Sequence, residues 1–77
     1  MDIRNLIRMA NDIGAYFAAY PNHDEAVAGI AAHLRNFWDP RMRRALIDYS
    51  NQEGGADLKP IVREAVLALA QQDRPAG

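Results

Sequence analysis

The residue types best suited to chemistry in this chain are concentrated between positions 33 and 44. This twelve-residue segment holds the only tryptophan, the aromatic pair Phe37-Trp38 and four of the eight arginines. Aromatic side chains and arginine supply large contact areas and bidentate hydrogen bonds, so an aromatic pair beside clustered guanidinium groups has the composition of a binding surface. The segment therefore indicates binding rather than bond chemistry.

Patterns for catalysis and metal binding are lacking in the sequence. His23 and His33 lie ten residues apart on or near one predicted helix, which separates them by about 15 Å, too far to share a metal ion. Ser50 is the only serine and has no histidine near it in sequence, so no nucleophile is paired with a base. Gly54-Gly55 is not followed by the lysine and hydroxyl residue of a phosphate-binding loop. We expect no catalytic residue and no metal site in this chain.

Length, charge and cysteine content bound the class of protein. Seventy-seven residues make one domain, and the absence of cysteine removes disulfides and thiolate zinc sites as supports for its small core. Nine basic and ten acidic residues give a net charge of −1, which argues against a nucleic-acid partner. No apolar stretch approaches the roughly 20 residues that span a bilayer, and Asp2 and Arg4 are unlike the start of a signal peptide. We expect a soluble, cytoplasmic protein without membrane contact.

Apolar residues recur at three- and four-residue steps along the chain, and no window alternates as a strand would. The spacing predicts an all-α fold, a small bundle of three to four helices. The expected elements are helices at about 3–20 and 24–37, a helix from 40 into a flexible loop at 50–55, and a helix at about 58–71. They form a single domain over residues 1–72, followed by a flexible tail at 73–77.

Local signals predict where these helices begin and end. Pro21 breaks the first helix, because its ring lacks an amide hydrogen and disfavours helical geometry in the preceding residue. Asn22 or His23 opens the second helix. We expect Gly54-Gly55 to be a hinge and Asp57 to cap the last helix.

The junction inside the 33–44 segment leaves two interpretations open. Asp39-Pro40 predicts a helix start, because the Asp side chain accepts from free first-turn amides and Pro is tolerated at the first helical position. Trp38 beside it is either a core residue or an interface residue. The arginines that follow form either a partner contact or a solvated face paired with carboxylates. The groups concerned are Arg41, Arg43 and Arg44, with Asp39, Asp48 and Asp12 as the carboxylates.

The first predicted helix carries three features that need an explanation beyond an apolar stripe. Gly14 costs about 1 kcal/mol relative to Ala in a helix interior, which close helix packing would justify. Asn11 competes for backbone hydrogen bonds, which indicates either a specific contact or a tolerated surface residue. Tyr16 and Tyr20 lie one turn apart and form either a second interface patch or a wider core.

Two sequence blocks carry a family resemblance. One is Phe37-Trp38-Asp39-Pro40-Arg41-Met42-Arg43, a pattern of Phe-Trp-x-Pro-Arg-Met-Arg that a generic amphipathic helix has no reason to reproduce. The other is Met9-Ala10-Asn11-Asp12-Ile13-Gly14, at matching distance. Together they resemble the delta subunit of soluble NAD-dependent molybdenum formate dehydrogenases, over roughly residues 3–69.

The resemblance implies a small non-catalytic subunit of a large enzyme. In that enzyme the alpha subunit holds a bis-molybdopterin guanine dinucleotide cofactor and iron–sulfur clusters, and other subunits carry FMN and use NAD. The delta subunit is expected to bind no cofactor itself, to contact the alpha subunit, and to support cofactor loading or stability of the complex. The candidate partner-binding residues are then His33, Phe37, Trp38, Arg41, Arg43, Arg44 and Asn11.

Two other functions compete with this interpretation. The chain is alternatively a transient chaperone for the molybdenum cofactor, with the arginines as an anion site at a helix N-terminus. A small helix-turn-helix DNA binder is a weaker alternative, because the charge is negative overall. An isolated accessory subunit can also form a homodimer to cover its exposed apolar face.

Overall fold

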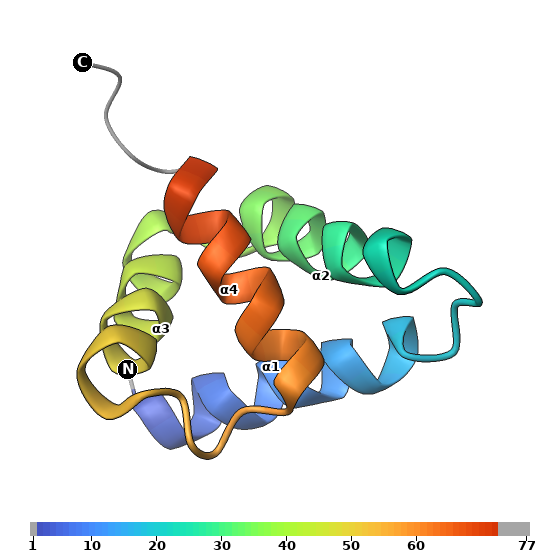
Figure 1. Ribbon diagram of the computed structural model, residues 1–77. Coiled ribbons are helices and arrows are strands. Elements are labelled where there is room, and N and C mark those ends of the chain that lie inside the picture. The colour runs from blue at the N-terminus through green and yellow to red at the C-terminus, as the bar shows by residue number, and fades with distance from the viewer. Residues whose placement is uncertain (1, 73–77) are drawn as a thin grey trace.

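Four α-helices make up the part of the chain that the structure, a computed structural model, describes, namely residues 2–72 (Figure 1). They are α1 (Ile3–Phe17), α2 (His23–Phe37), α3 (Pro40–Glu53) and α4 (Pro60–Gln72). The predicted small all-α bundle is confirmed. The tail predicted at 73–77 lies outside the described residues. No helix within the described range is long and apolar enough to cross a membrane.

The first three helices begin at side-chain caps. Asp2 accepts a hydrogen bond from the Arg4 amide at 3.0 Å, and Asn22 accepts one from the Glu25 amide at 3.0 Å. Asp39 does the same for the amide of Met42 at 3.0 Å, directly before Pro40. Each cap satisfies an amide that has no partner within its helix. The predicted starts at Asn22 and Asp39 are thereby confirmed.

Two helix boundaries differ from the prediction near proline and glycine. α1 ends at Phe17 rather than Tyr20, because the chain closes in tight turns before Pro21, with the amides of Ala19 and Tyr20 bonded three residues back. α3 continues to Glu53, where Gly54 ends it in the left-handed conformation at φ 73°. Glycine adopts that conformation without the penalty a Cβ brings.

The start of α4 also differs from the prediction. Asp57 does not cap this helix, which begins at Pro60. The Lys59 carbonyl instead accepts from the amides of Val62 and Arg63, at 2.9 and 3.0 Å. Leu58, expected to be helical, is buried in the core and precedes the helix. The helix starts two residues later than predicted, at Pro60, because proline disfavours helical geometry in the residue before it and is tolerated at the first helical position.

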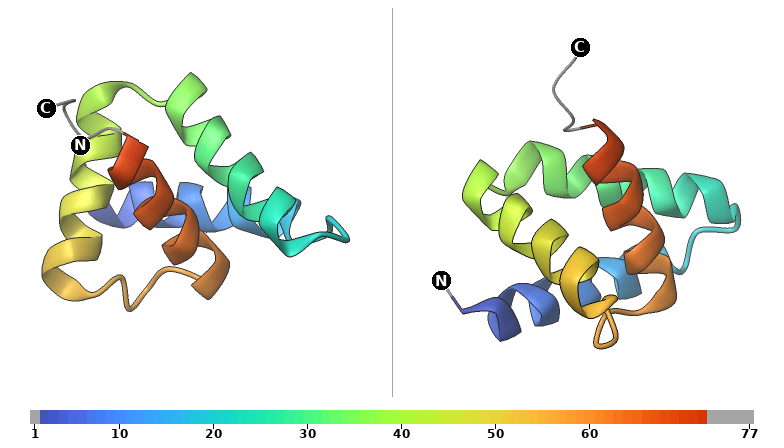
Figure 2. Two further views of the ribbon diagram at one scale, coloured as in Figure 1. Left: turned by 45° about the horizontal axis from the view of Figure 1, so that its top comes forward. Right: turned by 60° about the vertical axis from the view of Figure 1, so that its left-hand side comes forward.

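The helices α1, α2 and α3 form three sides of a frame, and α4 lies across it (Figures 1 and 2). α4 packs mainly against α2 and also contacts α1 and α3. The space between them is filled by one apolar core, whose burial supplies most of the stability of a domain this small. Its buried members are Leu6, Ile7, Ala10, Ile30, Ala31, Leu34, Trp38, Leu46, Tyr49, Leu58, Val62, Ala65, Val66 and Leu69.

Two glycines allow close contact between helices. A Cβ on Gly14 of α1 would lie 2.4 Å from Cγ2 of Val62 on α4. A Cβ on Gly29 of α2 would lie 2.5 Å from the Phe17 ring on α1. The close packing predicted to justify Gly14 is confirmed. The missing Cβ of Gly29 likewise allows α2 to pack closely against the end of α1.

Candidate functional site

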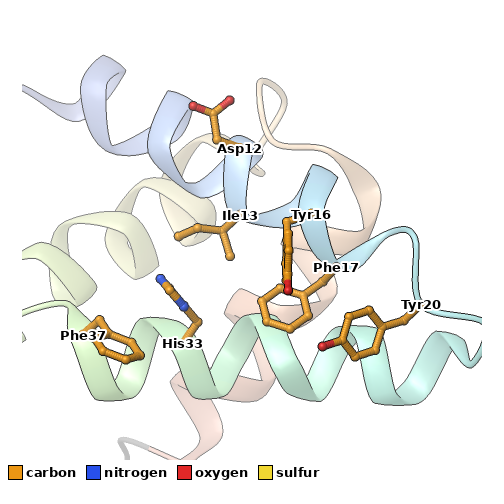
Figure 3. Close-up of a pocket in the computed structure, with 7 residues that line it drawn as sticks. All are labelled: Asp12, Ile13, Tyr16, Phe17, Tyr20, His33 and Phe37. Carbon is orange, nitrogen blue, oxygen red and sulfur yellow. The ribbon is translucent and has the colours of Figure 1, made fainter.

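An open groove lies between α1 and α2, and side chains of both helices line it (Figure 3). Its volume is about 600 Å³, within the range of specific ligand sites. We call it the aromatic groove. Its lining residues are Asp12, Ile13, Tyr16, Phe17, Tyr20, His33 and Phe37.

Helical spacing explains how these side chains come together. On α1, Ile13, Tyr16 and Phe17 fall at steps of three and four residues and so share one face. Tyr20 follows in the turn after the helix. On α2, His33 and Phe37 are four residues apart and lie on the face opposite (Figure 3). Two helical faces therefore form the two walls of the groove.

The rings of the groove contact one another in a continuous series. Phe17 is at its centre, with ring centroids 5.1 Å from Tyr16, 5.2 Å from Tyr20 and 6.4 Å from His33. The series ends with His33 against Phe37 at 4.7 Å. Tilted and edge-to-face pairs at these distances are favourable. Phe17 also rests on the bare backbone of Gly29. The rings thus support one another through contacts within the chain.

The outer rings are unusually exposed for apolar side chains. Phe37 is 74% exposed and Tyr16 is 69% exposed, while Tyr20 is 43% exposed. Contiguous exposed aromatic surface is typical of interaction sites. The groove is therefore suited to bind an apolar surface by burial and stacking.

Charge on the rim of the groove is negative. Asp12 is exposed, and its carboxylate makes no hydrogen bond or ion pair with any residue in 2–72. The groove lining contains no lysine or arginine. A ligand that places a cation beside an apolar group would therefore complement this site.

Trp38 and Phe37 are neighbours in sequence but differ in surroundings. Phe37, the last residue of α2, points into the groove, whereas Trp38 is 6% exposed and belongs to the core. Of the two interpretations of Trp38, the structure shows the core position. The role of Phe37 in binding a partner stays a prediction.

The three arginines at positions 41, 43 and 44 also differ in their contacts and exposure. Arg43 Nη1 donates to the carbonyls of Arg35 and Trp38, both at 2.9 Å, and so satisfies carbonyls that the end of α2 leaves without partners. Arg41 and Arg44 are exposed, and neither forms an ion pair within residues 2–72. The alternative of pairing with Asp39, Asp48 or Asp12 is therefore not seen for these two.

Asn11 makes a specific contact inside the chain. Its Nδ2 donates to the Asp57 carbonyl at 3.0 Å, and its Oδ1 accepts from the Lys59 amide at 2.9 Å. The side chain thus ties α1 to the loop before α4. The role in partner binding that was also expected of Asn11 stays a prediction.

Sequence reasoning missed part of the site. The sequence leaves Tyr16 and Tyr20 either in an interface patch or in a wider core, and the structure places them on the groove. Asp12, Ile13 and Phe17 were not candidates. The one-turn spacings among them and Tyr16 indicate that they share a face of the first helix. No residue close to them in sequence indicates that His33 and Phe37 lie opposite this face.

Titratable groups outside the groove show little clustering. His23 Nε2 lies 2.7 Å from Glu64 Oε2, an exposed pair that joins the start of α2 to α4. Among the residues that the structure describes, no three His, Asp or Glu side chains are close enough to hold a metal ion.

The fold and the groove define a small all-α protein with an exposed aromatic groove between α1 and α2. The chain belongs to the family of the NADH-dependent formate dehydrogenase delta subunit FdsD, whose family model matches residues 5–66. That range begins in α1 and ends within α4, so it contains every lining residue of the groove. The resemblance inferred from the two sequence blocks is confirmed. No curated protein and no solved structure matches the chain.

Proposed function

We propose that this chain is a non-catalytic, cytoplasmic accessory subunit that binds the molybdenum-containing alpha subunit of NAD-dependent formate dehydrogenase. The observation that carries the proposal is the family match over 62 residues, from 5 to 66, because it takes in most of the helical domain. In this proposal the bis-molybdopterin guanine dinucleotide, iron–sulfur clusters, FMN and NAD are bound by the other subunits. The role of the chain is cofactor loading or stability of the complex.

Binding energy alone would suffice for such a role. A ligand that binds only the folded or cofactor-loaded state of its partner stabilises that state by mass action, by about 2.7 kcal/mol at a concentration 100 times its dissociation constant. A small subunit with a preformed binding face can therefore support a much larger one without contributing a reacting group.

The exposed arginines of α3 are proposed to contribute to this contact. Arg41 and Arg44 are one turn apart and are free of ion pairs within the described residues. Guanidinium groups bind carboxylates and phosphates bidentately, so the partner groups would be carboxylates or cofactor phosphates of the alpha subunit. His33 and Phe37 are proposed to contact the same subunit from the groove.

Co-purification tests the proposal. The formate dehydrogenase complex is purified by a tag on this chain, and its subunits and molybdenum are quantified, with a parallel preparation from cells that lack the chain. Equal subunit ratios would support an accessory subunit, and a fall in molybdenum on deletion would add a loading role. An active, metal-replete complex from which the tagged chain is absent would overturn the proposal and favour a transient factor.

Charge reversal tests the arginines separately. The double variant R41E/R44E should no longer co-purify with the alpha subunit, since each carboxylate would repel the acidic or phosphate groups that it meets. Retention with unchanged affinity would show that these arginines lie outside the contact. The double variant K59E/R63E, at two exposed positions at the start of α4 and away from the groove lining, is the matched control for a change in net charge.

A further inference from the structure

We propose that the aromatic groove receives one amphipathic helix from a neighbouring formate dehydrogenase subunit, and that a lysine or arginine of this helix pairs with Asp12. The inference rests on the proposed function, because it assumes that the chain is part of the complex. It adds the surface, the form of the occupant and its charge.

The exposure of the walls favours a macromolecule over a small molecule. Specific small-molecule sites cover most of their ligand. Here Tyr16 and Phe37 remain more than two-thirds exposed, and the groove opens along its length (Figure 3). Such walls would leave a small ligand mostly in water, whereas an extended apolar surface would cover them.

The shape of the groove favours a helix. Its walls are one face each of α1 and α2, and the ridges and grooves of packed helices accept a third helix between them. An amphipathic helix laid in an apolar groove presents its anchors at one-turn spacing. The groove presents its own rings at the same spacing, with Tyr16 and Tyr20 on one side and His33 and Phe37 on the other.

The charge of the rim specifies the occupant further. Asp12 lies at the edge of the groove with its carboxylate turned away from the rings (Figure 3), and it has no partner within residues 2–72. A cation on the edge of a docked helix would complement this charge. The lining itself offers no lysine or arginine.

The same argument disfavours a second copy of this chain. A symmetric dimer formed groove to groove would bring two negatively charged Asp12 rims to one contact, and its lining residues would supply neither lysine nor arginine. A helix from another subunit carries no such restriction.

Preorganisation makes the groove suitable for tight binding. Phe17 is held between Gly29 and three neighbouring rings, so its position costs little further ordering on binding. Rigid aromatic anchors are the residues whose truncation most weakens protein interfaces.

Site-specific crosslinking within the assembled complex tests the identity of the occupant. A benzophenone side chain replaces Tyr16, which is exposed and on the groove wall. Crosslinks to a helical segment of another formate dehydrogenase subunit that contains lysine or arginine would support the inference. Crosslinks to a second copy of this chain, or none in a complex that retains it, would overturn it.

Affinity measurements test the energetics. Formate dehydrogenase purified from cells that lack this chain is titrated with the labelled chain. Tyr16→Ala and Phe37→Ala should each raise the dissociation constant about 30-fold or more, as truncation of aromatic anchors does. Leu67→Ala, at a 56% exposed apolar position of α4 outside the groove, should change it less than about threefold. Equal effects at all three positions would overturn the inference.

Charge substitution tests the predicted cation. Asp12→Asn should weaken binding and Asp12→Lys should weaken it more, while circular dichroism and melting temperature show each variant folded. Replacing the crosslinked helix's basic residue by Glu should restore the binding of Asp12→Lys. Asp12→Lys binding as tightly as the wild type would overturn the inference.

These outcomes are distinct from failure of the proposed function. If the wild-type chain is missing from the complex, both proposals fall. If the chain is present but the groove variants bind normally, only the groove inference falls. Crosslinks to a helix of a subunit other than alpha would support the groove and overturn the alpha assignment.

Discussion

Asn11 and Asp57 are joined across 46 residues of sequence by a hydrogen bond of 3.0 Å from the Asn11 side chain to the Asp57 carbonyl. Because the same amide group accepts from Lys59, one side chain satisfies two backbone groups of the loop between α3 and α4. This contact determines how the start of α4 is held against α1, and it leads to the first prediction.

Asn11→Ala should lower the free energy of unfolding by about 1–3 kcal/mol, because two hydrogen bonds are lost and loop groups must find water instead. Chemical denaturation measures it. The matched control is Asp12→Ala at the next position, which has no partner within 2–72 and should change stability by less than about 0.5 kcal/mol. Equal losses in the two variants would contradict the role of Asn11.

Gly14→Ala should destabilise the protein although alanine is the better helix former. The added Cβ would lie 2.4 Å from Val62 Cγ2, and overpacking of this kind costs about 1–3 kcal/mol. The double variant Gly14→Ala with Val62→Ala should show coupling, because the smaller side chain removes the clash. A double-mutant cycle in urea measures the coupling, and strict additivity would count against direct contact.

Arg43→Ala should destabilise the junction between α2 and α3. Its loss leaves the carbonyls of Arg35 and Trp38 without their donor, at an expected cost of about 1–3 kcal/mol. Arg44→Ala is the control, since that side chain is exposed and should be nearly neutral. Thermal denaturation of both variants checks the difference, and equal melting temperatures would refute it.

The N-cap of α1 should contribute a small acid-sensitive stability. The hydrogen bond from the Arg4 amide, and then that from its side chain, holds the pKa of Asp2 below its ordinary value of 3.8. A carboxyl whose pKa is lower in the folded state adds stability above the unfolded value, and this is lost as pH falls through the folded value.

Asp2→Asn supplies the comparison, because asparagine caps a helix without titrating. The melting temperature of the wild type relative to this variant should be highest above pH 4 and should decline below it. A difference that stays constant down to pH 2 would contradict the assignment.

Much of the fold was predictable because its signals are local. Asp39 before Pro40 marks a helix start through a hydrogen bond three residues away, and Asn22 does the same. The start of α4 was predicted wrongly at Asp57 for the opposite reason. There Leu58 is buried in the core and Asn11, from another helix, bonds the Asp57 carbonyl and the Lys59 amide.

The candidate site shows the same division. The sequence blocks at 9–14 and 37–43 indicated the family, and the family model confirms it over residues 5–66. Neighbouring residues in sequence do not determine which members of those blocks face outward. Phe37 is 74% exposed and Trp38 is 6% exposed, although both are aromatic and adjacent. Their exposed fractions differ because α2 ends at Phe37, and Trp38, just after the helix, packs into the core.

By itself, the sequence determined the helices, most of their starts and the family, because helical periodicity, capping and short blocks depend on residues within a few positions of one another. Only the tertiary structure decided that Tyr16, Phe17 and Tyr20 meet His33 and Phe37 in one groove, and that Asn11 and Arg43 bind backbone groups within the chain. The physical reason is that a side chain's neighbours across helices depend on how the helices pack around the shared core, which no single segment specifies.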